Sequence, residues 1–484
     1  MSWLSAHINI YMSKVIQWYV TKKHVNPHDR SILSNYFPWN DLKSKTINQI
    51  FREMNTNIGE AHIGRFSFKS DFDYHTWKDY HKETEIKFID TDGKTFNPRD
   101  LNIFPIRFRT NEDHVFMHKA LCPFGHLPKS VIEWLRHNKQ CSIVFHDANE
   151  AKAITSKEFV TIPGLISKRK EYNLENKFVY LDSRANADVL HEKSYYPIPD
   201  WLVFIGCSNW LQFVGHTASK KDIDEVIRLS NRRPLFKQGR FLFYSGRLRP
   251  ARYLIMDHLL KDIKREHLWL SASNAGVNPS DIRSILDYSN QIQTESNLKT
   301  YYTATDREKI VDLSLKTPIN TFPEQLQEEK VDYHKLKWFW IPNPAHYSRA
   351  FIDISCETYN ERHGAYGADL FITEKICKPI LAKRPFICSA NPGLYQELKK
   401  LGFITFNKWW DESFAEECDI KQHIQKLIRV ITKLDKLTDA ECKEMWDDMQ
   451  DVLQHNQDTL LYYTHSSPRA WITELRKARH KKLI

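Results

Sequence analysis

The C-terminal half of the chain alternates between short apolar segments and longer stretches with helical patterning, and no other feature constrains the fold as much. The apolar segments are typical of buried strands and lie at 241–245, 267–273, 336–342, 350–355, 384–390 and 403–406. Helical patterns separate them, among them 250–264, a stretch from Thr373, and a stretch that Asn391-Pro392 opens and Gly402 closes. Strands that alternate with helices in this way predict a parallel, doubly wound α/β sheet.

The chain has 484 residues, too many for one ordinary hydrophobic core, so we expect two α/β domains. In the N-terminal half the clearest strand-like segments are 139–147 and 201–209. The polar, proline-containing stretch 231–238 precedes the first strand of the C-terminal half. We therefore predict domains at 1–235 and 236–455, and a basic helical tail at 456–484 that packs back on the first domain.

The composition excludes several classes of protein. Only 14 glycines and 27% charged residues argue against the fibrous and the disordered classes. No stretch reaches the roughly 18 uncharged apolar residues that a membrane span requires. The first twenty residues are apolar but interrupted by His7, Asn9 and Lys14, and they predict an amphipathic helix of the fold rather than a secretory signal. We expect a cytoplasmic protein that has no membrane partner.

The sequence predicts neither a metal centre nor a cofactor. Asp90-Thr91-Asp92 has the spacing of a divalent-cation motif, but Asp92-Gly93 favours a hairpin turn. Three histidines are not spaced as a convincing ligand set: His114, His118 and His126. The eight cysteines form no CxxC pair, and we expect buried free thiols at 122, 141, 207, 356, 377, 388, 418 and 442.

The most informative motif is FITEKICKPILAKRPFICS at 371–389. Thr373 is a good N-cap, and it places Glu374 and Lys375 in the first turn of the helix. Free N–H groups and a positive dipole make a helix N-terminus an anion site, and Lys375 adds a positive charge suited to a diphosphate. Glu374 can accept hydrogen bonds from the hydroxyls of a ribose. The alternative is that Glu374 only complements the helix dipole and that Lys375 is a solvated surface charge.

A second motif, FLFYSGRLRPARYLIMDHLL at 241–260, joins a strand to a helix through a glycine and arginines. Gly246 permits close approach of the backbone to a ligand, and Arg247 or Arg249 can bind phosphate oxygens in pairs. The alternative is that the arginines are surface residues that cap a turn. Both motifs follow predicted parallel strands, at the carboxyl ends where such sheets bind ligands.

These segments resemble a known family. The stretch 350–414, with TEK, KP, PFI and the later GF-x-TF string, is similar to a group of phage and giant-virus glycosyltransferases, and more distantly to the donor-binding stretch of α1,3-fucosyltransferases. The strand–GRL loop resembles the start of the C-terminal domain in many GT-B enzymes, and R-x-R-P-x-R occurs in the same viral group. The resemblance implies a GT-B fold, in which two Rossmann-like doubly wound domains face a central cleft.

The resemblance also implies roles for individual residues. Glu374 would hold the ribose of a nucleotide-diphosphate sugar, preferably a UDP-sugar, and Lys375 would hold its diphosphate. Glu357 matches the "ET" that precedes TEK in the viral group. It would either contact hydroxyls of the donor sugar or serve as a buried structural carboxylate.

An inverting sugar transfer needs a group to take the proton of the acceptor hydroxyl. The resemblance to GT-B enzymes implies that this base comes from the N-terminal domain. His146-Asp147 end an apolar strand, and this arrangement resembles that of a phage DNA α-glucosyltransferase and of many retaining GT-B enzymes. Asp147 is the first candidate, His146 the second and Glu150 a distant third. The alternative is that Asp147 caps the turn that follows.

The acceptor is suggested mainly by charge. A formal net charge of +10 and an isoelectric point of about 8.9 favour a polyanionic partner, although a generally basic, solvated surface accounts for them equally well. With the resemblance to phage enzymes, we expect double-stranded DNA with a hydroxymethylated pyrimidine, modified in the host cytoplasm after base flipping. The alternatives are a glycan or protein acceptor with a GDP-sugar donor, and a non-catalytic nucleic-acid-binding or virion protein.

Overall fold

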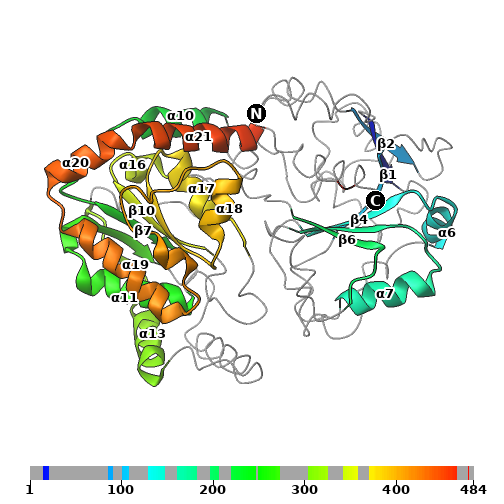
Figure 1. Ribbon diagram of the computed structural model, residues 1–484, viewed down its shortest axis with the longest axis horizontal. Helices are drawn as coiled ribbons and strands as arrows, with labels where there is room; N and C mark the ends of the chain where they lie inside the picture. The colour runs from blue at the N-terminus through cyan, green and yellow to red at the C-terminus, as the bar shows by residue number, and fades with distance from the viewer. Residues whose placement is uncertain are drawn as a thin grey trace. The chain divides into compact units, whose positions relative to one another are not determined.

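The computed structural model describes the following parts of the chain: 15–20, 85–90, 101–107, 129–147, 161–182, 197–206, 220–246, 249–272, 303–324, 342–357, 370–465 and 478. The chain forms two compact units, which are coloured along the sequence in Figure 1. The first unit comprises Met1–Gln212 with His465–Ile484, and the second comprises Phe213–Thr464.

These divisions fall at other places than the predicted boundaries at 235 and 455. Helix α10 (Lys220–Ser230) belongs to the second unit because it packs against α16 (Pro344–Tyr347) and α17 (Glu374–Leu381). Residues 456–464, predicted as the start of a tail on the first domain, lie inside α21 (Gln450–His465). There Gln457 Nε2 donates to the carbonyl of Leu381 at 2.6 Å, which ties α21 to the second unit.

The first unit contains a six-stranded sheet in the order β2-β1-β3-β4-β5-β6, and all its pairings are parallel. Two described helices, α6 (Lys129–His137) and α7 (Thr161–Glu171), connect strands of this sheet. The strands are β1 (Val15–Val20), β2 (Glu85–Asp90), β3 (Leu101–Arg107), β4 (Ser142–Asp147), β5 (Phe178–Asp182) and β6 (Leu202–Gly206). The strands predicted within 139–147 and 201–209 are confirmed as β4 and β6.

One prediction for the N-terminal region is wrong, and a second one is not tested. Residues 15–20 form β1 and not part of an amphipathic helix, because the run VIQWYV is rich in β-branched and aromatic side chains and lies between β2 and β3. The hairpin predicted around Asp92-Gly93 stays a prediction, because the structure describes β2 only as far as Asp90 and then no residue before 101. Asp92 and Gly93 themselves lie outside the described residues.

The second unit contains a five-stranded sheet in the order β11-β10-β7-β8-β9. Its strands are β7 (Phe241–Ser245), β8 (Leu268–Ala272), β9 (Ile319–Asn320), β10 (Ile352–Cys356) and β11 (Phe386–Ser389). The predicted parallel sheet is confirmed for β7, β8, β10 and β11, whereas β9 pairs antiparallel with β8. All five residues of β10 are buried, so this strand lies in the core. The strand predicted at 336–342 falls almost wholly outside the described residues.

Helices cover the sheet of the second unit on both sides (Figure 1). Helix α11 (Pro250–Asp262) packs against α13 (Ala304–Lys316) and α19 (Ile420–Asp435), and α17 contacts β10, β11 and α10. Helices α18 (Leu394–Lys400) and α20 (Asp439–Asp448) complete the unit with α21. None of the described helices has both the length and the apolar character that crossing a bilayer demands.

Local signals misplace two elements near residue 400. Residues 403–406 are not a strand, because the side-chain amide of Asn456 in α21 bonds both the N–H and the carbonyl of Ile404 at 2.8 Å. The backbone groups that a strand would pair are therefore already satisfied. Helix α18 begins at Leu394 and not at Pro392, since Gly393 has a φ of +93°, outside the helical region. Gly402, with a φ of +92°, follows its end as predicted.

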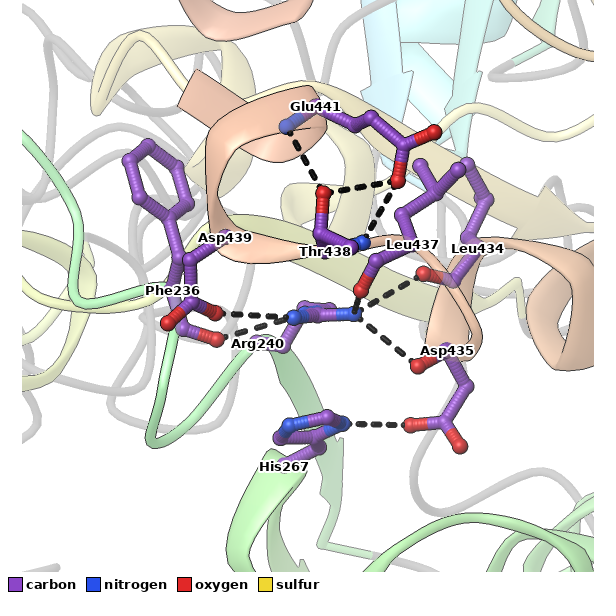
Figure 2. Close-up of polar contacts among 9 residues, drawn as sticks. All are labelled: Phe236, Arg240, His267, Leu434, Asp435, Leu437, Thr438, Asp439 and Glu441. Carbon is purple, nitrogen blue, oxygen red and sulfur yellow. Dashed lines mark hydrogen bonds and ion pairs between the residues drawn. The ribbon is translucent and has the colours of Figure 1, made fainter.

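Buried polar groups hold the amino edge of this sheet, the edge at which its parallel strands begin. Arg240, directly before β7, is 1% exposed and donates through Nη1 to the carbonyls of Leu434, Asp435 and Leu437 at 3.1, 3.0 and 2.8 Å (Figure 2). Its Nη2 pairs with Asp439 at 3.2 Å. Arg240 thus ties the first strand of the unit to the end of α19.

The described cysteines are free thiols. Cys141, Cys356, Cys377, Cys388 and Cys442 are buried as predicted, whereas Cys418 is exposed. Cys122 and Cys207 lie outside the described residues.

Candidate functional site

The strand order of the second unit reverses between β7 and β10. From β7 the sheet continues to β8 on one side, and from β10 it continues to β11 on the other. Open α/β sheets bind ligands at the carboxyl ends of the strands at such a switch point. Gly246 directly follows β7 and Glu357 directly follows β10. The topology therefore brings two of the residues singled out in the sequence to the place where a ligand is expected.

Helix α17 begins at this carboxyl edge with the predicted cap. Thr373 has extended backbone angles, and its Oγ1 accepts a hydrogen bond from Lys375 N at 3.3 Å. Lys375 Nζ donates to the same Oγ1 at 3.0 Å and forms an ion pair with Glu374 Oε1 at 2.9 Å. The side chain of Lys375 is 22% exposed and that of Glu374 8%. The first turn of α17 therefore holds a partly accessible cation beside a nearly buried carboxylate.

Glu357 lies behind this turn and is 0% exposed. Its Oε1 accepts a hydrogen bond from Thr373 N at 2.9 Å, and its Oε2 accepts one from Thr373 Oγ1 at 2.5 Å. Its own backbone N–H donates to the carbonyl of Ser389 at the end of β11, at 2.8 Å. This burial argues against a direct contact of Glu357 with hydroxyls of a donor sugar, the first of the two roles that the sequence leaves open.

The pKa values of the two carboxylates of the site, Glu357 and Glu374, are shifted in opposite directions. Burial raises the pKa of Glu357, and the charge of Lys375 and the hydrogen bonds from Thr373 offset only part of that effect. Burial also acts to raise the pKa of Glu374, but the charges of Lys375 and Lys378 outweigh it, so the pKa of Glu374 is lowered. Glu374 is therefore held as an anion at neutral pH and can accept hydrogen bonds from hydroxyl groups.

The arginine motif divides into residues with different positions. Arg247 lies outside the described residues. Arg249 is half-buried and precedes α11, whose first residue is Pro250 as predicted. Gly246 is exposed, and a Cβ added there would meet no atom within 4 Å. Nothing that packs against residue 246 therefore requires a glycine at this position.

Arg252, the third arginine of the same string, received no role in the sequence analysis. It is 4% exposed, and its Nη2 donates to the carbonyls of Cys356 and Glu357 at 3.0 and 3.1 Å. It thereby connects α11 to the end of β10 across the switch point. The available signal was its place in the first turn of a helix that must cover a sheet.

Asp353 and its partner were also missed. Asp353 lies inside β10, is buried, and accepts a hydrogen bond from the Tyr347 hydroxyl at 2.7 Å. Burial raises the pKa of Asp353 to about 7, although the hydrogen bond from Tyr347 and the charge of Lys378 oppose the shift. An aspartate inside an otherwise apolar strand was the only sequence signal.

The candidate base lies in the first unit. His146 and Asp147 are the last residues of β4, so the predicted strand end is confirmed. Asp147 is the register partner of Asp182, the last residue of β5, which the sequence analysis did not single out. The strand order of this sheet reverses between β1 and β3, one strand away from β4. Glu150 lies outside the described residues, and its role stays a prediction.

Within the parts of the chain that the structure describes, no group of three or more His, Cys, Asp or Glu side chains could hold a metal ion. His114, His118 and His126 fall outside those parts.

Comparison with known proteins gives little beyond this geometry. No family model and no curated protein sequence matches the chain. Among solved structures the chain is similar to a glycosyltransferase from Rickettsia africae ESF-5, with 12% identity over 97% of both chains and a TM-score of 0.32. A TM-score this low does not establish a shared fold, so the candidate site rests on the topology and contacts of the chain itself.

Proposed function

We propose that the protein is a glycosyltransferase that takes its sugar from a nucleotide diphosphate bound at the carboxyl edge of the second unit. One observation carries the proposal: the capped N-terminus of α17, with Glu374 and Lys375 in its first turn, lies beside the topological switch point. A helix N-terminus with a lysine attracts phosphate, and an ionised carboxylate accepts hydrogen bonds from sugar hydroxyls. A nucleotide diphosphate carries both groups.

The ion pair within the site supports an exchange of partners on binding. Lys375 Nζ bonds Glu374 Oε1 at 2.9 Å, and 22% of its side chain remains exposed. A diphosphate offers the ammonium group a stronger, multiply charged partner than a single carboxylate. Glu374 would then turn to the two hydroxyls of the ribose. Each residue thus has a protein partner before binding and a ligand partner after it.

The same groups suit the chemical step. When the glycosidic bond breaks, negative charge grows on the departing diphosphate, and the α17 dipole and Lys375 stabilise that charge. Arg249 lies between β7 and α11, directly before α11, and we propose it as a further cation for the phosphates. Arg247, two residues earlier in the sequence, is proposed for the same role. Asp147 at the end of β4 is the proposed base for the acceptor hydroxyl if the reaction inverts, with His146 as the alternative.

For the acceptor we propose a hydroxymethylated pyrimidine in double-stranded DNA, supported by the net charge of +10. Such a partner makes a quantitative demand, because binding releases counterions. The logarithm of the affinity should fall linearly with the logarithm of the salt concentration, by about 0.9 for each phosphate neutralised. A neutral glycan acceptor should show almost no such slope.

The test is a transfer assay read by mass spectrometry. The protein is incubated with a panel of UDP- and GDP-sugars and with duplexes that carry or lack hydroxymethylated pyrimidines. We expect a mass gain of one sugar on the modified duplex only, because the unmodified one has no hydroxyl to react. Transfer of a sugar to a glycan, with no transfer to any duplex, would overturn the proposed DNA acceptor in favour of a glycan. If the protein neither transfers a sugar nor hydrolyses any of the nucleotide sugars, the result would favour the non-catalytic alternative.

A further inference from the structure

We propose that Glu357 is a positioning residue of this site, which acts through Thr373 to set where the ammonium group of Lys375 lies. The proposal rests on the function proposed above, since it concerns how the diphosphate is held. It assigns Glu357 a role without contact to the ligand.

The direction of the hydrogen bonds supports this role. Thr373 gives its backbone N–H to Glu357 Oε1 and its hydroxyl proton to Glu357 Oε2, at 2.9 and 2.5 Å. With its proton engaged, Thr373 Oγ1 can only accept further hydrogen bonds. It accepts them from Lys375 N at 3.3 Å and Lys375 Nζ at 3.0 Å. The carboxylate therefore fixes the acceptor that holds Lys375.

Two hydrogen bonds anchor the backbone of Glu357. Its N–H bonds the carbonyl of Ser389 at the end of β11, and its carbonyl accepts from Arg252 of α11. Its side chain is buried with the rest of the residue, at 0% exposure, so a ligand cannot reach the carboxylate in this arrangement. Through its carboxylate, Glu357 thus fixes the first turn of α17 relative to β10, β11 and α11.

A purely structural role explains the buried charge less well. Burying a carboxylate costs several kcal/mol before compensation, and apolar side chains of similar volume often stabilise a fold equally well or better. Burial indeed raises the pKa of Glu357, so its ionised form is not favoured by the surroundings alone. A carboxylate that orients Thr373 and complements the charge of Lys375 gives a reason for an acid at this place.

The test compares diphosphates with nucleosides by calorimetric titration of the full chain with UDP, GDP, uridine and guanosine. Glu357→Gln has the same shape but offers one acceptor oxygen where two are used. We expect about tenfold weaker binding of UDP or GDP, the loss of one hydrogen bond to a charged group. Nucleoside affinity should stay within about twofold, because Lys375 faces the phosphates.

A double-mutant cycle with Lys375→Ala separates positioning from general damage to the site. If Glu357 acts through Lys375, then Glu357→Gln should weaken UDP or GDP binding no further in the Lys375→Ala background. Thr373→Ser should bind like wild type, and Thr373→Val should reproduce Glu357→Gln. The matched control is Asp435→Asn, a buried carboxylate at the opposite edge of the same sheet, which should leave both affinities unchanged.

The outcomes separate this proposal from the one it rests on. Equal losses from Glu357→Gln with and without Lys375 would overturn the positioning role, as would an equal loss of nucleoside affinity. If Glu357→Gln does not fold, the comparison of Thr373→Ser with Thr373→Val decides, and equal diphosphate affinities for both would overturn it. Failure of the wild-type protein to bind either diphosphate would instead remove the proposed function.

Discussion

The two edges of the sheet in the second unit use the same kinds of side chain for different purposes. At the amino edge Arg240 precedes β7, His267 precedes β8 and Arg384 precedes β11. At the carboxyl edge Glu357 follows β10, and α17 begins with Thr373, Glu374 and Lys375. Both edges combine cations with buried carboxylates. They differ in where the cations stand relative to the helix dipoles.

At the amino edge, buried cations take carbonyl partners. Arg240 bonds three carbonyls at the end of α19, where the helix dipole is negative (Figure 2). Arg384 is 1% exposed and donates to the carbonyls of Tyr347 and Arg232 at 2.6 and 3.0 Å. His267 bonds the buried carboxylate of Asp435 at 2.6 Å. This edge is therefore a closed structural network.

At the carboxyl edge, Lys375 lies at the positive end of the α17 dipole, an unfavourable place for a cation. Its Nζ bonds its neighbour Glu374 and the hydroxyl of Thr373, and 22% of the side chain is exposed. The comparison shows that buried cations alone do not mark a binding site. A cation placed against the local dipole and left partly accessible is the informative feature, because an anionic ligand would relieve both conditions.

The largest effect should come from breaking the amino edge. Arg240→Met removes the donor that three carbonyls share and should lower the free energy of unfolding by about 3–5 kcal/mol. Urea denaturation measures the loss, and the affinity for UDP at a temperature where the variant is folded should not change. A loss under about 1 kcal/mol would contradict the structural role of this edge. Weaker UDP binding by a fully stable variant would contradict the division between the edges.

The next effect concerns Asp353, which lies within β10 between the two edges. Its pKa is raised from 3.8 to about 7, so between these pH values the folded protein keeps the Asp353 proton, whereas the unfolded chain has lost it. The contribution of this proton to the free energy of unfolding is therefore fully present below about pH 4 and is lost as the pH rises to about 7. Relative to wild type, Asp353→Asn should gain about 2–4 kcal/mol of stability between these pH values.

Urea denaturation of both proteins from pH 4 to pH 8 measures this difference. The other carboxylates of the site, Glu357 and Glu374, titrate in both proteins and cancel in the comparison. Parallel stability curves for the two proteins would show that Asp353 is ionised in the fold.

The smallest of these effects concerns the role of Glu374 at the carboxyl edge. Glu374→Ala should weaken uridine and guanosine as well as UDP and GDP, by about 1–2 kcal/mol, because its proposed partner is the ribose. Titration of the four compounds against the variant checks this expectation. A variant that loses only diphosphate affinity would place Glu374 among the groups that hold Lys375 rather than at the ribose.

How much of this could be read from the sequence depends on how local the cause is. The runs at 241–245 and 350–355 and the cap at Thr373 carry their own signals, so the strands and the first turn of α17 were predictable. Ile404 gives no such signal, since its partner Asn456 comes 52 residues later. Residues 15–20 were assigned to a helix because their place between two strands depends on pairing with 85–90 and 101–107.

The site shows the same limit. The proximity of Glu374 and Lys375 follows from adjacency in the chain, and the proposed role of Lys375 at a phosphate follows from the helix start. The bonds between Glu357 and Thr373 close a separation of 16 residues, and Arg252 reaches Glu357 over 105. Such contacts depend on the order β7-β10-β11, which strand patterns alone do not give. The sequence therefore revealed the groups of the site but not their mutual support.

The most direct test of the account is a calorimetric titration of the wild-type protein and of Lys375→Ala with UDP and GDP. We expect the wild-type protein to bind at least one diphosphate more tightly than its nucleoside. Lys375→Ala should lose about 1.5–3 kcal/mol of that binding, with an unchanged free energy of unfolding. Absence of binding by the wild-type protein, or equal binding by Lys375→Ala, would contradict the assignment of the carboxyl edge as a nucleotide-diphosphate site.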